Sequence, residues 1–181
     1  MKKLVVLSGN SVKNRDWGEA VVERFRPLFD EAYMQYYDHW ESGEEVIDFE
    51  REAEKLKAEV EKGDEDTEYY VFAKSFGSVL TLLSTSKGYI SPKRCVFFGM
   101  PLNLVEEQNI FGSDWTPLRN FVVPSIAFQN IDDPVASYTF LKEKFTEFNI
   151  SDIQVIRKEG DNHAYTELEE YEEEITQFLE L

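Results

Sequence analysis

Ser75 is the residue in this chain whose surroundings most clearly predict chemistry. It lies in the segment 73–77, which reads Ala-Lys-Ser-Phe-Gly, between a predicted strand and a predicted helix. A sharp strand-to-helix turn crowds the backbone, so small residues are needed two positions before and two positions after an exposed serine. The pattern predicts a nucleophilic serine, and the alternative is a serine that only caps the helix.

A carboxylate and a histidine follow later predicted strands. Asp133 stands directly before Pro134, and His163 lies in a polar loop after the last strand. A histidine can accept the proton of a serine, and a carboxylate can hold the histidine in the correct tautomer. The alternatives are a helix cap for Asp133 and an exposed loop residue for His163. The second histidine, His39, is expected to pack at the rim and has no predicted catalytic role.

The elements that must position these residues alternate along the chain. Short apolar runs rich in β-branched and aromatic residues predict about six strands. These runs cover residues 4–7, 32–37, 67–73, 94–98, 125–129 and 153–156. About five segments with helical apolar spacing lie between and after them. The pattern predicts one α/β domain over residues 1–181, with a mostly parallel six-stranded sheet and helices on both faces.

In such a sheet, ligands bind at the carboxyl ends of the strands, where the serine, the carboxylate and the histidine all fall. The segment 102–122 also follows a strand end, and its Gly and Pro residues predict an irregular insertion. It could overhang Ser75 with an apolar wall, or it could be a plain surface connection. The expected substrate-pocket residues are Met100, Leu104, Phe111 and Trp115.

Two helix starts are predicted from capping residues. Ser42 and Glu45 have the spacing of a capping box, and they precede the clearest amphipathic pattern in the chain. Another helix is expected to begin at Pro134, since proline is favoured in the first turn.

The composition excludes several classes of function. The chain carries 19 Lys+Arg and 36 Asp+Glu residues, a net charge of −17, so binding to nucleic acids or anionic membranes is not expected. The single cysteine, Cys95, allows no intramolecular disulfide and fits a cytoplasmic protein. No apolar run is long enough for a signal peptide or a membrane span. No metal-ligand spacing is present, so we expect no metal and no cofactor.

The order Ser75, Asp133, His163 resembles that of the α/β-hydrolase superfamily. The resemblance covers nearly the whole chain, including the segments 97–101 and 160–163, which look like later strand ends of that superfamily. Within it, the chain is similar to small serine hydrolases without a cap domain, such as the dienelactone-hydrolase-like group. There are departures: Ser8 stands where a histidine is often found, and Ala73 replaces the first glycine of the serine turn.

The resemblance implies a minimal α/β-hydrolase fold that lacks the N-terminal antiparallel strands. It implies a serine hydrolase of small acyl esters or thioesters, in which Ser75 forms an acyl-enzyme, His163 is the base and Asp133 supports the histidine. The backbone N–H groups of Asn10 and Phe76 would form the oxyanion hole. The partner would be a small acyl substrate, and no oligomeric state is predicted.

Two other readings remain at this point. One is a hydrolase-fold interaction module with little turnover, whose acidic surface would suit a basic partner. The other is a flavodoxin-like binding domain that uses the segment 8–11 as a phosphate loop. The second lacks a glycine-rich signature, and the net charge opposes an anionic ligand.

Overall fold

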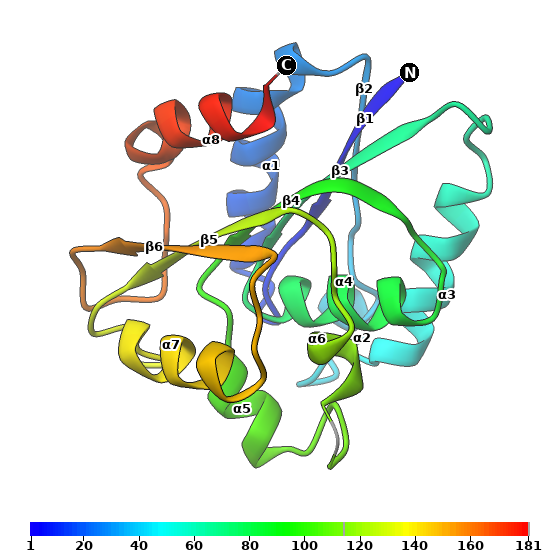
Figure 1. The fold of residues 1–181 in the computed structure, drawn as a ribbon. Coiled ribbons are helices and arrows are strands. Elements are labelled where there is room, and N and C mark those ends of the chain that lie inside the picture. The colour runs from blue at the N-terminus through cyan, green and yellow to red at the C-terminus, as the bar shows by residue number, and fades with distance from the viewer. Residues whose placement is uncertain (114, 181) are drawn as a thin grey trace.

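The computed structural model describes residues 1–113 and 115–180. Within them the chain forms one sheet of six parallel strands in the order β2-β1-β3-β4-β5-β6 (Figure 1). The strands are β1 (Lys2–Leu7), β2 (Glu31–Met34), β3 (Glu68–Lys74), β4 (Pro92–Phe98), β5 (Ser125–Asn130) and β6 (Ile153–Lys158). The predicted parallel six-stranded sheet is confirmed.

Helices cover both faces of the sheet (Figure 1). One face carries α1 (Asn14–Phe25), which continues into η1 (Arg26–Leu28), together with η2 (Leu168–Tyr171) and α8 (Glu172–Leu179). The other face carries α3 (Phe49–Val60), α4 (Phe76–Ser86) and α7 (Tyr138–Glu147). Three short helices lie in the lower part of Figure 1: α2 (His39–Ser42) follows β2, and α5 (Leu102–Glu107) and α6 (Thr116–Arg119) lie between β4 and β5.

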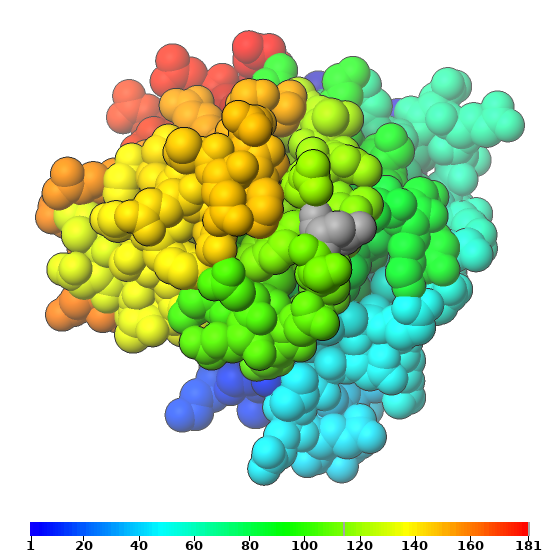
Figure 2. All heavy atoms as spheres, turned by 60° about the horizontal axis from the view of Figure 1, so that its bottom comes forward, coloured from blue at the N-terminus to red at the C-terminus, as the bar shows by residue number. Residues whose placement is uncertain are grey.

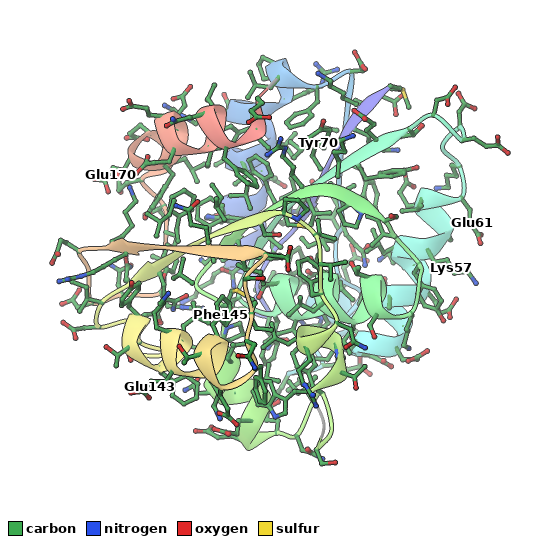
Figure 3. The ribbon with its side chains drawn as sticks, in the orientation of Figure 1. Lys57, Glu61, Tyr70, Glu143, Phe145 and Glu170 are labelled. Carbon is green, nitrogen blue, oxygen red and sulfur yellow. The ribbon has the colours of Figure 1, made fainter. Side chains whose placement is uncertain are left out.

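Successive residues of a strand belong to two separate hydrophobic cores, one on each face of the sheet. In β1, Leu4 and Val6 pack with α1 and α8, whereas Val5 and Leu7 pack with α3 and α4. Side chains alternate between the faces of a strand, and both faces are covered, so the strand reads as a continuous apolar run. A surface helix, in contrast, carries apolar residues on the side that faces the sheet and charged residues on the other side. In Figure 3, Phe145 of α7 points toward the sheet and Glu143 points away from it.

The predicted capping box at Ser42 and Glu45 is wrong. Ser42 belongs to the short helix α2, which ends at Gly43 in a left-handed conformation (φ 81°). The amphipathic helix α3 begins at Phe49, and the Asp48 side chain accepts a hydrogen bond from the Arg51 N–H at 3.1 Å. Aspartate is as good an N-cap as serine, so the local sequence offers two starts and tertiary packing selects one.

The segment 102–122 is more regular than its sequence predicts, since it carries α5 and α6. Leu102, Val105 and Leu118 are buried in the core on the α4 side of the sheet. The apolar residues of this segment are therefore used for packing against the domain. In the described part of the chain, no helix is both long enough and apolar enough to cross a membrane.

Candidate active site

Ser75 occupies the turn between β3 and α4 with φ 49° and ψ −124°. A positive φ is unfavourable for a residue with a side chain, and such strain is concentrated at functional turns. The turn is held by the Ser75 N–H, which donates to the Phe98 carbonyl at 2.9 Å. A Cβ atom at Gly77 would lie 2.0 Å from the Leu7 carbonyl oxygen, so only glycine lets α4 start this close to β1. The local structure is the sharp strand-to-helix turn that the sequence predicts.

Asp133 follows β5 and is buried, with 3% of its surface exposed. Its carboxylate lies 2.8 and 2.9 Å from Nδ1 of His163, which follows β6. It also accepts hydrogen bonds from the Tyr165 hydroxyl at 2.6 Å and from the Val135 N–H at 2.8 Å. The neighbouring Asp132 is exposed. Of the two adjacent acids, Asp133 is therefore the one that contacts the imidazole.

The surroundings of Asp133 favour its ionised form. Burial alone raises the pKa of this carboxyl, because the charge loses its hydration. The hydrogen bonds and charge of His163, with the bonds from Tyr165 and Val135, act in the opposite direction and prevail. The pKa of Asp133 therefore lies below its ordinary value, and the carboxylate is charged at neutral pH.

His163 is held with one ring nitrogen on the carboxylate, so we assign its proton to Nδ1. The other nitrogen, Nε2, is buried and has no hydrogen-bond partner among the described residues. Its lone pair is free to accept a proton. A Cβ atom at Gly99 would lie 2.7 Å from the ring carbon Cε1, so a glycine there leaves the imidazole its space. Within the described residues, no hydrogen bond joins Ser75 Oγ to this nitrogen, and such bonds often tighten only when substrate binds.

The two expected oxyanion donors lie next to strand ends as well. Phe76 is the first residue of α4, where an N–H has no partner inside the helix. Asn10 lies in the loop after β1. Neither N–H donates a backbone hydrogen bond within residues 1–113 and 115–180. Their role in an oxyanion hole stays a prediction.

The expected pocket residues are mostly part of the core. Met100, Phe111 and Trp115 are buried, and Leu104 is half-buried and packs against the same cluster. The Trp115 ring lies 5.1 Å from the ring of Phe148, the residue after α7. Their role in binding substrate also stays a prediction.

Lys74 and Tyr165 are functional candidates that the sequence did not indicate. The Lys74 side chain is buried, its ammonium donates to Asn14 Oδ1 at 2.8 Å, and it lies 5.7 Å from the ring centroid of Trp17. Burial lowers the pKa of Lys74 to about 8, against the opposing charge of Asp133. The available signal was a lysine that interrupts an apolar strand directly before the candidate nucleophile.

Tyr165 connects the acid to the helix layer. Its hydroxyl donates to Asp133 and accepts from the Asn130 N–H at 3.0 Å. Its carbonyl oxygen accepts a hydrogen bond from Trp17 Nε1 at 2.9 Å. Nothing in the local sequence distinguishes this tyrosine from an ordinary core residue.

Among the described residues, no group of three or more His, Cys, Asp or Glu side chains is placed to hold a metal ion. The site as it stands consists of a strained turn at Ser75, which is buried with 8% of its surface exposed, a paired carboxylate and imidazole, and two backbone N–H groups without a partner among the described residues. This set of groups can supply a nucleophile, a base and an oxyanion site for acyl transfer.

Comparison with known proteins agrees at the level of the fold. No protein-family model matches the chain, and no curated protein matches its sequence. The solved structure of Est1E from Butyrivibrio proteoclasticus with bound ferulic acid is similar, with a TM-score of 0.73 and 14% identity, covering 99% of this chain and 88% of that one. A putative YdeN-like hydrolase from Pectobacterium atrosepticum gives 0.68 and 15%, covering 99% and 91%.

Acyl-protein thioesterase 2 from Zea mays is also similar, with a TM-score of 0.67 and 14% identity, covering 98% of this chain and 94% of that one. At such low identity the likeness concerns the fold alone. The chain has the fold of these α/β hydrolases, so the fold that the resemblance implies is confirmed.

Proposed function

We propose that this protein is a serine hydrolase that cleaves small acyl esters or thioesters. The observation that carries the proposal is the contact between Asp133 and His163 Nδ1 at 2.8 Å, which leaves Nε2 without a partner among the described residues. The strained turn at Ser75 is bonded to the Phe98 carbonyl, and the His163 ring lies against the next residue, Gly99. One of the similar structures is named an acyl-protein thioesterase, and that name supports the same chemistry.

In the proposed reaction, Ser75 Oγ attacks the substrate carbonyl carbon while its proton passes to His163 Nε2. The bond from that carbon to the leaving oxygen or sulfur then breaks, and the leaving group takes the proton from Nε2. Water attacks the acyl-enzyme with His163 again as base, the bond from the acyl carbon to Ser75 Oγ breaks, and Nε2 returns the proton to Oγ as the free acid leaves. Asp133 stays ionised throughout and stabilises the imidazolium, which its lowered pKa favours.

The N–H groups of Asn10 and Phe76 would bind the oxyanion that forms on the carbonyl. Such donors contribute about 3–4 kcal/mol each in the transition state. We infer small acyl groups as substrates because the segment 102–122 packs its apolar residues into the core, so it does not build a separate cap over the serine.

The decisive test is labelling with a fluorophosphonate, followed by peptide mapping of the adduct. We expect the label on Ser75 and none in the Ser75→Ala variant, because only an activated serine reacts. Ser84→Ala is the matched control: this serine lies on the same helix, and its hydroxyl has no partner among the described residues. A label on Ser78 would show that the nucleophile is misplaced. An unlabelled wild-type protein would favour the interaction module with little turnover.

A further inference from the structure

Asn10 is held by an unusual number of hydrogen bonds from one neighbouring segment. Its carbonyl oxygen accepts from His39 Nε2 at 2.6 Å and from Trp40 Nε1 at 2.8 Å. Its side chain accepts from the Ile47 N–H at 2.8 Å and donates to the Glu45 carbonyl at 2.9 Å. The Asn10 N–H, in contrast, has no hydrogen-bond partner in the described chain.

The segment that holds Asn10 is itself well anchored. His39 is buried, with 6% of its surface exposed, and its ring stacks on Tyr37 with centroids 5.7 Å apart. The Tyr37 hydroxyl donates to the Ser8 carbonyl at 2.8 Å, so the residues after β2 contact the loop after β1 at two carbonyls. In Figure 2 the blue segment after β1 lies beside the cyan segment that contains α2, on the face at the carboxyl ends of the strands.

The tautomer of His39 follows from its hydrogen bond to the Asn10 carbonyl. Nε2 faces a carbonyl oxygen, which can only accept, so we assign the proton to Nε2. Nδ1 is buried and has no hydrogen-bond partner among the described residues. His39 therefore acts as a donor to the backbone, and among the described residues no carboxylate contacts its ring as Asp133 contacts that of His163.

We propose that His39 and Trp40 are positioning residues that fix the Asn10 N–H as the second donor of the oxyanion hole. The inference rests on the proposed function and adds residues to it that do not touch the substrate. Two donors bind the Asn10 carbonyl oxygen and restrict movement of the main chain there. The two side-chain hydrogen bonds of Asn10 restrict it further. An oxyanion donor acts through being oriented in advance, since no reorganisation is then needed when charge develops.

The size of the effect follows from the sensitivity of such donors to position. Loss of one oxyanion donor lowers kcat by about 10²–10³, and a misplacement of about 1 Å can cost about 10². We expect His39→Phe and Trp40→Phe each to lower kcat on p-nitrophenyl acetate by about 10–100-fold. KM should change less than about threefold, because the oxyanion forms only in the transition state.

Conservative variants separate positioning from general packing. The amide nitrogen of His39→Gln can take the place of Nε2 and donate to the Asn10 carbonyl, so this variant should recover most of the lost kcat. His39→Asn has the same amide on a side chain one carbon shorter and should not recover it. The comparison of these two polar variants remains valid if the phenylalanine variants fail to fold. Tyr69→Phe is the control, because it removes one donor to a main-chain carbonyl, that of Val60, far along β3.

The outcomes are distinguishable. If kcat in both phenylalanine variants stays within twofold of the wild type, the inference is overturned and the proposed hydrolase stands. If Tyr69→Phe loses as much kcat, or if His39→Asn matches His39→Gln, the effect is general loosening and the inference is again overturned. If the wild-type protein neither hydrolyses the ester nor reacts with a fluorophosphonate, the proposed function fails and the inference fails with it.

Discussion

Substituting Asp133 with asparagine tests the proposed triad most directly. In the folded protein, one carboxylate oxygen accepts from the N–H groups of Val135 and Ala136, and the other accepts from the Tyr165 hydroxyl. An asparagine side chain would keep its carbonyl oxygen toward the two N–H groups, because an amide NH₂ there would face two donors. The NH₂ group would then replace Oδ2, which lies 2.8 Å from His163 Nδ1, and the remaining oxygen, 2.9 Å from Nδ1, would stay shared with the two N–H groups.

An NH₂ group at that place donates to Nδ1 instead of accepting from it, which favours the tautomer whose proton is on Nε2. Nε2–H cannot take the proton of Ser75, and the base is lost. We expect kcat/KM to fall by about 10³–10⁴, which corresponds to about 4–5.5 kcal/mol of transition-state stabilisation. The fold should be retained, because the substitution keeps the shape of the side chain and the bonds from Val135 and Ala136.

The assay is hydrolysis of p-nitrophenyl acetate, with thermal unfolding as a check of the fold. Asp132→Asn is the matched control, since Asp132 is exposed and does not contact the imidazole, and it should cost less than about tenfold. The reverse ranking would refute the assignment of the acid, and two fully active variants would refute any role for an aspartate in the triad.

Three further results are expected. In the wild type, the free energy of unfolding should rise by about 3 kcal/mol between about pH 8 and 10.5, because over that range the unfolded chain holds the Lys74 proton and the native chain does not. Lys74→Met should flatten this rise, and urea titrations at several pH values measure it. Tyr165→Phe should destabilise the fold by about 1–3 kcal/mol, since the Asn130 N–H loses its acceptor. Thermal unfolding measures this, and an unchanged unfolding temperature would contradict the role of the Tyr165 hydroxyl. Gly77→Ala should cost more than about 2 kcal/mol and should reduce labelling of Ser75, because the new Cβ would meet the Leu7 carbonyl oxygen, and a stable, fully labelled variant would contradict this.

The sheet was predictable from the sequence because parallel strands buried on both faces must be apolar at nearly every position. The runs at 4–7 and 94–98 show this, and both lie inside observed strands. The serine turn was predictable for a related reason: the contact between Gly77 and the Leu7 carbonyl imposes a small residue, and that requirement is visible in the sequence.

Helix starts were less predictable because several polar residues compete for the same role. The helix expected from Pro134 begins at Tyr138, where the Ser137 hydroxyl accepts from the Phe140 N–H at 3.2 Å. The N–H groups of Val135 and Ala136 are bonded to the Asp133 carboxylate instead, so the turn that holds the acid delays the helix. The sequence cannot show this, since it depends on which way Asp133 points in the fold.

The supporting residues of the site were the least predictable part. Lys74, Tyr165 and His39 act through contacts to residues far away in the chain, and each has an ordinary structural explanation when seen alone. Burial of Lys74 is visible only once α1 is packed over the end of β3 and brings Asn14 and Trp17 to it. Polar side chains used inside a fold carry no periodic signal of the kind that marks strands and helices.

These contacts make α1 the element that connects the three parts of the site. Asn14, its first residue, binds the ammonium of Lys74, which precedes Ser75, and its side-chain amide donates to the Ser11 carbonyl in the loop of the expected oxyanion donor. One turn later, Trp17 binds the carbonyl of Tyr165, whose hydroxyl holds the acid. Three strand ends that are separate in the sequence are thus fixed to one helix. A helix with internal hydrogen bonds is stiffer than a loop, so the geometry of the site depends on how α1 packs on the sheet as much as on the loops that carry its residues.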